Sequence, residues 1–132
     1  VRNLSIHGFG DTTNVWSFGG GIWVGAVTGT VITGNVIGTG PFNFTDPGFA
    51  ERNSKNILLE GSDDSIIQGN LVAFSQSHGI YLFTGSDGNT ISGNEVRGNG
   101  IGAPFFDGID LGGSNNTISS NLITGNLSPG VD

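Results

Sequence analysis

The sequence predicts an all-β protein that winds as a parallel β-helix of about five coils with two loop insertions. Glycine supplies 25 of the 132 residues, and a glycine in a helix interior costs roughly 1 kcal/mol relative to alanine. Only 11% of the residues are charged, against about one quarter in an ordinary globular domain. Short apolar strands recur between Gly/Asn/Ser turns, and no segment is long enough for a crossover helix. These three observations favour stacked parallel strands without helices.

The repeat has two recognisable parts. The motif Ile-x-Gly-Asn-x-[Val/Ile] begins at Ile32, Ile67 and Ile91 and, with Ser in place of Gly, at Ile118. A second short strand lies upstream of each copy and begins at Ile22, Ile57, Ile80 and Ile109. The first Ile of this strand precedes the repeat Asn by 12–14 residues in all four copies. Each copy is therefore expected to form one coil.

The alternation of side chains along a strand sorts the inner from the outer residues. One inner stack is expected from the upstream strands: Ile22/Val24, Ile57/Leu59, Ile80/Leu82 and Ile109/Leu111. The motif supplies a second inner stack: Ile32, Ile67, Ile91 and Ile118. The repeat asparagines fall where the chain turns sharply, and their amides can bond from one coil to the next. They are Asn35, Asn70, Asn94 and Asn121, and we expect a structural ladder rather than a binding site.

Residues 1–132 are expected to form one β-helix segment of a longer chain, with neighbouring domains and an irregular first coil at 1–20. Insertions at 38–54 and 99–107 interrupt the even spacing, and residues 128–132 match the start of a further coil. Phenylalanines in the insertions are expected to pin these loops to the wall of the coil. They are Phe42, Phe44, Phe49, Phe105 and Phe106.

The repeat resembles a known group of proteins. Gly79–Leu82 followed by Gly88–Asn94 looks like the right-handed repeats of the pectin-lyase-like superfamily, above all those with carbohydrate-binding and sugar-hydrolase repeats, including periplasmic copper-accessory proteins. Residues 34–39 also resemble large bacterial surface repeat proteins. The resemblance implies a right-handed coil, contact with polysaccharide, and a location that is extracellular, at the cell surface or periplasmic.

The register places a group of polar and aromatic residues on the outer face of the upstream strands. Lys55, His78 and Asp107 are expected to stack on successive coils, beside Tyr81 and Asp110. A glycan-binding face would use Trp23, Tyr81, Lys55 and Glu60. In such a face the aromatic rings would cover sugar rings, and the lysine would neutralise a uronate carboxylate.

The same residues are the candidates for catalysis. Lysine, histidine, tyrosine and aspartate are the residue types that alginate-type lyases and epimerases use, which points to Lys55, His78 and Tyr81. Residues 107–110 and 77–79 also look like the Asp-Gly-Ile-Asp and His-Gly motifs of polygalacturonases. In an inverting hydrolase Asp107 and Asp110 would hold carboxyl groups about 6.5–9.5 Å apart around a water. No complete catalytic motif is present, so whether the protein is an enzyme stays open.

No metal or other cofactor is expected, and calcium is the alternative. Its ligands would be carboxylates from Glu60, Asp63, Asp64, Asp87, Asp107 and Asp110, although aspartates of this kind also form turns. The chain offers few copper ligands, because it has no Cys, no Met and two His.

Charge and hydropathy argue against two classes of partner, nucleic acid and the membrane interior. The net charge of −7 and the total of four basic residues argue against nucleic acid, since phosphate binding needs a basic patch. The sequence has no run of 18 apolar residues, so no membrane span is expected. The leading hypothesis is a secreted or cell-surface β-helix scaffold or binding module that contacts polysaccharide. The alternative is part of a polysaccharide lyase, epimerase or glycoside hydrolase that acts on uronate-containing glycans.

Overall fold

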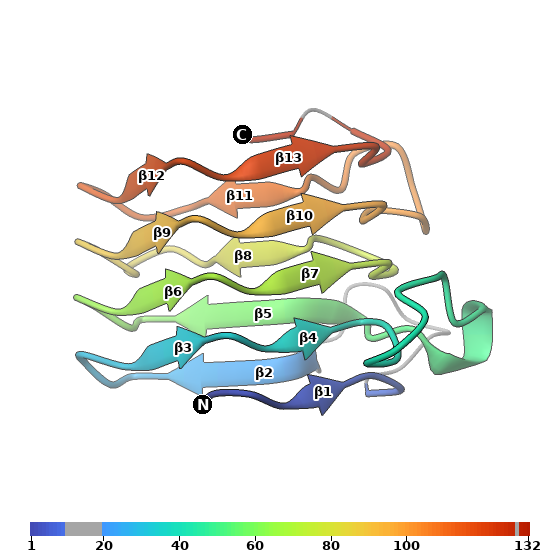
Figure 1. Ribbon diagram of the computed structural model, residues 1–132. Helices are drawn as coiled ribbons and strands as arrows, with labels where there is room; N and C mark the ends of the chain where they lie inside the picture. The colour runs from blue at the N-terminus through green and yellow to red at the C-terminus, as the bar shows by residue number, and fades with distance from the viewer. Residues whose placement is uncertain (10–19, 129) are drawn as a thin grey trace.

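The computed structural model describes residues 1–9, 20–128 and 130–132, and these residues wind as a parallel β-helix (Figure 1). Every strand pairs in parallel with the equivalent strand of the neighbouring coil, and the strands form three sheets. The five-stranded sheet confirms the expectation of about five coils. The predicted irregular coil at 1–20 is described only in part, because residues 10–19 lie outside the described residues, as does Pro129.

Each full coil contributes one strand to each sheet. The first sheet contains β2 (Gly20–Gly25), β5 (Lys55–Glu60), β8 (Ile80–Leu82) and β11 (Ile109–Leu111). The second contains β3 (Val31–Thr33), β6 (Ile66–Gln68), β9 (Thr90–Ser92) and β12 (Thr117–Ser119). The third contains β1 (Ser5–Ile6), β4 (Val36–Ile37), β7 (Leu71–Ala73), β10 (Glu95–Arg97) and β13 (Leu122–Thr124). The one helical turn in the described chain is η1 (Phe49–Glu51).

The core is a set of aliphatic columns that run along the axis. The two predicted columns are confirmed: Ile57, Ile80 and Ile109 are fully buried in the first sheet, and their counterparts Ile32, Ile67 and Ile91 are fully buried in the second. A third column, which the sequence analysis did not separate, is formed by Ile6, Ile37, Val72, Val96 and Ile123 of the third sheet. Three apolar faces therefore meet inside each coil, which is why short strands suffice.

The repeat asparagines form a continuous hydrogen-bonded ladder at the corner between the second and third sheets. In each step the backbone N–H and Nδ2 of one Asn donate to Oδ1 of the Asn on the next coil, at 2.9–3.0 Å. The steps run through Asn35, Asn70, Asn94 and Asn121. At the N-terminal end the row stops at Leu4, whose N–H donates to Asn35 but which has no amide side chain.

Two further ladders occupy the other corners and were missed in the sequence analysis. Between the third and first sheets, Asn56 and Ser75 donate to Asn99, which donates to Asn126. Between the first and second sheets, Ser65 donates to Asn89 and Asn89 to Asn116. The spacing of 24 or 27 residues recurs in all three ladders.

A shared backbone conformation explains these ladders. The residue before each ladder position except Asn56 has a positive φ, as at Gly93 and Gly98, both at 61°. Glycine adopts this conformation without strain, whereas Ser120 holds it at 56° before Asn121. The signal was therefore present in the sequence as further Gly-Asn pairs, at residues 88–89, 98–99 and 125–126.

The longest connections all lie at the corner between the third and first sheets. Residues 38–54 join β4 to β5 and residues 98–108 join β10 to β11, whereas residues 74–79 join β7 to β8. The first of these loops reaches across the third sheet, where Nη2 of Arg97 donates to the Phe44 carbonyl. The expected pinning of the loops by phenylalanine is wrong for most of them. Phe106 is 1% exposed, but Phe42 is 93% exposed, and Phe44, Phe49 and Phe105 are exposed as well.

Replacing a central ladder residue is expected to unfold the coil locally. In Asn94→Ala the buried backbone N–H of Asn70 loses its acceptor, and its Nδ2 keeps only the Ile32 carbonyl. Each buried hydrogen that is left unsatisfied costs about 1–3 kcal/mol. The free energy of unfolding in urea should therefore fall by about 3 kcal/mol or more. The matched variant Asn43→Ala, at an exposed loop position, should change it by less than about 0.5 kcal/mol. Equal effects from the two variants would contradict the structural role of the ladder.

Candidate functional site

The strand register brings the predicted outer residues of the first sheet together. Ile57 pairs with Ile80 and Ile80 with Ile109, so the residues two positions earlier, Lys55, His78 and Asp107, fall in one row. Trp23, Leu58, Tyr81 and Asp110 form the neighbouring row. The stacking of His78 on Tyr81, with ring centroids 4.7 Å apart, shows that the two rows lie side by side on one face although they are three positions apart along the chain.

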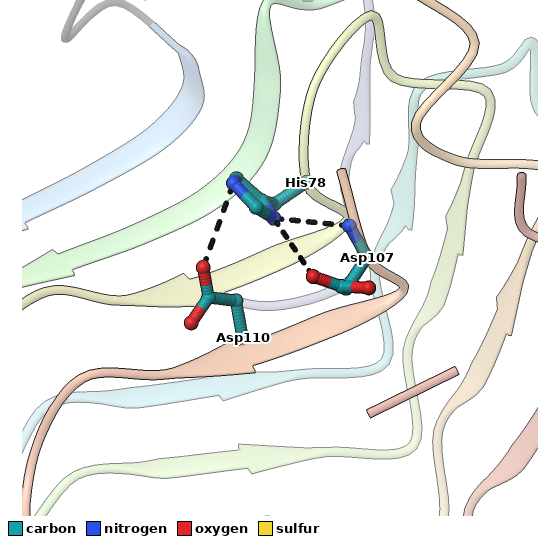
Figure 2. A group of neighbouring side chains, drawn as sticks. All are labelled: His78, Asp107 and Asp110. Atoms are coloured by element: carbon teal, nitrogen blue, oxygen red, sulfur yellow. Dashed lines mark hydrogen bonds and ion pairs between the residues drawn. The ribbon is translucent and has the colours of Figure 1, made fainter. Parts of the chain in front are cut away.

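His78 is at the centre of the site (Figure 2). Its Nδ1 accepts a hydrogen bond from the backbone N–H of Asp107 at 3.1 Å and lies 4.0 Å from Oδ2 of the same residue. Its Nε2 lies 3.5 Å from Oδ2 of Asp110. The imidazole ring stacks on Tyr81 with centroids 4.7 Å apart and meets the edge of Phe106 at 5.1 Å. Contacts on both faces therefore fix the plane of the ring.

The second asparagine ladder positions this group. A Cβ on Gly79 would lie 2.6 Å from the Gly108 carbonyl oxygen and 2.8 Å from Nδ2 of Asn99. A Cβ on Gly108 would similarly lie 2.6 Å from Nδ2 of Asn126. Glycine at these positions lets the ladder amides approach the backbone directly. The residues just before them, His78 and Asp107, are held by the same packing.

The outer face is far less exposed than the sequence suggested. Lys55, His78 and Asp107 are only 5%, 8% and 5% exposed, so the row predicted on the outer face is covered rather than open to solvent. Part of the cover comes from Phe106, which the insertion between β10 and β11 places against the imidazole. Tyr81, Glu60 and Asp110 are half-buried, whereas Trp23 is 58% exposed.

Burial changes the acid–base properties of the site. Burial and the nearby Lys55 lower the pKa of His78 to about 4. Burial, Asp107 and Asp132 raise the pKa of Asp110 to about 6. Burial raises the pKa of Asp107 and Tyr81 and lowers that of Lys55. Near pH 5 the imidazole is therefore neutral while Asp110 carries a proton, the reverse of the order in free side chains.

Ligand atoms of His78, Asp107 and Asp110 lie within 4.8 Å of one another, and no other such group of three occurs in the described parts of the chain. The hydrogen bonding does not suit a metal ion. Because Nδ1 of His78 accepts the Asp107 N–H, the proton of the neutral ring is on Nε2. A metal at Nε2 would need the other tautomer, with two N–H groups pointing at each other. The nearest oxygens of Asp107 and Asp110 are also closer than the 6.5–9.5 Å separation expected of an inverting pair.

The other predicted site residues are located elsewhere or have different contacts. Nε1 of Trp23 donates to Oε2 of Glu60 on the next coil at 3.1 Å. Asp63 and Asp87, named among the calcium ligands, each accept a backbone N–H from the following coil. They do not converge with the His78 group and act as turn residues.

Two cavities lie away from the His78 group, beside the third sheet. One of about 330 Å³ is lined by Phe44, Leu71, Glu95 and Arg97 among others. The second, of about 390 Å³, is lined by Asp46, Phe74, Ile101 and Leu127 among others. The loop at 38–54 contributes to both, and Arg97 lies between them, over the ring of Phe74.

The comparison with protein families matches the whole chain. A family model described as a right-handed beta helix region covers residues 1–132. The chain belongs to this family. Its three parallel sheets also fit a pectin-lyase-like β-helix. Neither the curated proteins nor the solved structures yield a match. No helix in the described residues is long and apolar enough to cross a membrane.

The reversed order of protonation can be measured. In an NMR titration the His78 ring should stay neutral down to about pH 4, and the Asp110 carboxyl should titrate near pH 6. The urea-unfolded chain is the control, and there His78 should titrate near pH 6.5 and Asp110 near pH 3.9. A folded-state His78 that protonates at its ordinary pH would contradict the site described above.

The two shifts have opposite effects on stability. Between pH 4 and 6.5 the unfolded chain binds a proton at His78 that the folded chain does not, so the contribution of His78 to the free energy of unfolding decreases as the pH falls. Between pH 6 and 3.9 the folded chain binds a proton at Asp110 that the unfolded chain does not, so the contribution of Asp110 to the free energy of unfolding increases as the pH falls. Asp110→Asn should therefore lose stability as the pH falls from 6.5 to 4.5, and His78→Asn should gain it. Parallel pH profiles of unfolding for both variants would contradict this.

Proposed function

We propose that this β-helix is a polysaccharide-binding module of an exported protein and that it contacts glycan through the outer face of its first sheet. The observation that carries the proposal is the ring of Trp23, which is 58% exposed and fixed by its hydrogen bond to Glu60. An exposed indole that is held in one orientation offers a preformed apolar plate. Sugar rings have apolar faces and polar edges that suit such a plate with polar groups beside it.

The surroundings of Trp23 support the same proposal. Trp23 pairs with Leu58, and Leu58 pairs with Tyr81, so the two aromatic rings are two coils apart, about 9–10 Å at the usual strand spacing. Leu58 between them is fully buried. Beyond Tyr81 the row continues to Asp110, which supplies hydrogen-bonding capacity at one end. A chain of sugars lying along the helix axis would meet Trp23, Tyr81 and Asp110 in turn and would pass over the buried Leu58.

The proposed location is extracellular, at the cell surface or periplasmic. It is supported by the resemblance of the repeats to exported polysaccharide-contacting proteins. The fold itself serves as a rigid scaffold, and the outer residues of its successive coils can contact a long, repetitive ligand.

Removing the exposed indole tests the proposal. We expect Trp23→Ala to weaken glycan retention, measured by affinity electrophoresis and calorimetry, by about tenfold or more, because an aromatic contact contributes about 1.5–3 kcal/mol. Glu60→Ala should weaken binding less, and Glu60→Gln should keep an acceptor for the indole and retain most of it. Phe42→Ala removes a more exposed aromatic ring elsewhere and should have no effect. The proposal fails if a broad panel of glycans includes none whose retention depends on Trp23.

The alternative is that the segment belongs to a polysaccharide lyase, epimerase or hydrolase. The observation in its favour is the group of His78, Asp107 and Asp110, in which the pKa of Asp110 is raised to about 6. A carboxyl group with such a pKa can hold a proton near neutral pH and transfer it to a glycosidic oxygen. The fixed Nε2–H of His78 lies beside Asp110 and orients this carboxyl group.

An activity assay distinguishes the alternative from simple binding. For an enzyme, Asp110→Asn should reduce the release of reducing ends or of unsaturated products by about 100-fold or more. The rate of the wild-type chain should also change with pH around the pKa of about 6. Asp87→Asn, which makes the same change in a turn, is the control. If the wild-type chain turns over every glycan no faster than Asp110→Asn does, the enzymatic alternative is excluded.

A further inference from the structure

We propose that the glycan bound at the outer face of the first sheet is uncharged rather than a polyuronate. This inference rests on the proposed function and adds the chemical class of the ligand. It follows from the distribution of charge around the face and replaces the pairing of Lys55 with a uronate carboxylate that the sequence favoured.

The face gathers carboxylates. Asp107 and Asp132 lie close enough to Asp110 to raise its pKa through like-charge repulsion. Glu60 adds a further half-buried carboxylate beside Trp23. In the part of the chain that the structure describes, Lys55 is the basic residue in this group, and it is 5% exposed. Asp107 is equally buried, so the charged groups of this face that stay accessible to a ligand are the acidic Glu60, Asp110 and Asp132.

The other basic residues cannot compensate. Arg52 pairs with Asp46 within the 38–54 loop. Arg97 pairs with Glu95 at 2.8 Å and donates to the Phe44 carbonyl on the third sheet. The backbone of Arg2 pairs with that of Thr33 at the end of β3, which places Arg2 beside the second sheet rather than the first. With a net charge of −7 over the whole chain, the long-range field also opposes the approach of a polyanion.

Neutral sugars suit the same groups. A sugar hydroxyl both donates and accepts, so it can donate to the carboxylates of Glu60 and Asp110 and accept from the Nε2–H of His78. A uronate brings an acceptor-only carboxylate to a surface that already consists largely of acceptors. Each such contact near 4 Å costs about 1 kcal/mol even in water, so the face should discriminate between the two classes by more than about tenfold.

The test compares neutral polysaccharides, namely xylan, mannan and mixed β-glucan, with polygalacturonate and alginate on the full chain at pH 7.5. We expect retention of at least one neutral polymer, lost in Trp23→Ala, and binding of the polyuronates at least about tenfold weaker. Repulsion is screened by salt, so any residual polyuronate binding should rise with added salt. Asp110→Asn should strengthen polyuronate binding more than Asp87→Asn, which removes the same charge from a turn.

The outcomes separate the two proposals. Polyuronate binding that equals or exceeds neutral binding and weakens with salt would overturn this inference while leaving glycan binding intact. An absence of binding to every polymer would overturn the proposed function and this inference with it. Neutral binding that needs Trp23, together with polyuronate binding that rises with salt, supports both.

Discussion

Hydrogen bonds between carboxamides on neighbouring coils are the interaction on which the rest of this structure depends. A coil made of strands only two to six residues long cannot hold its shape through strand pairing alone, because each strand ends in a sharp corner. At most of these corners an amide side chain accepts the backbone N–H of the coil before it, as Asn94 does for Asn70. The buried turn backbone is thereby satisfied, and the aliphatic columns between the corners stay in register.

The same interaction fixes the chemistry on the outside of the coil. Asn99 packs against the backbone at Gly79, and this holds His78 where the Asp107 N–H reaches its Nδ1. That hydrogen bond determines the tautomer, and the tautomer in turn determines that the imidazole presents a donor to Asp110. The properties of the outer group therefore derive from an internal row of amides, together with Phe106 from the connection between β10 and β11.

The sequence predicted the coil and its register because both follow from local repetition. The Ile-x-Gly-Asn motif marked the inner residues and one ladder, and the constant offset to the upstream strand placed Lys55, His78 and Asp107 in one row. It did not predict that this row is buried, because the cover includes Phe106 from an insertion whose residues are not part of the repeated pattern. It also missed the ladders through Asn89 and Asn99, since their Gly-Asn pairs are not preceded by the repeated Ile.

Variation in the length of the coils is concentrated at one corner. The turn before each repeat Asn is constant, whereas the connections from the third to the first sheet are the ones that lengthen, at 38–54 and 98–108. One of these connections supplies Phe106 against His78. Evolution, or an engineer, can thus exchange loops at this corner to reshape what borders the outer face, provided that the ladder through Asn99, which lies at the same corner, keeps its partners. The aliphatic columns and the other two ladders lie outside these loops and are free of that constraint.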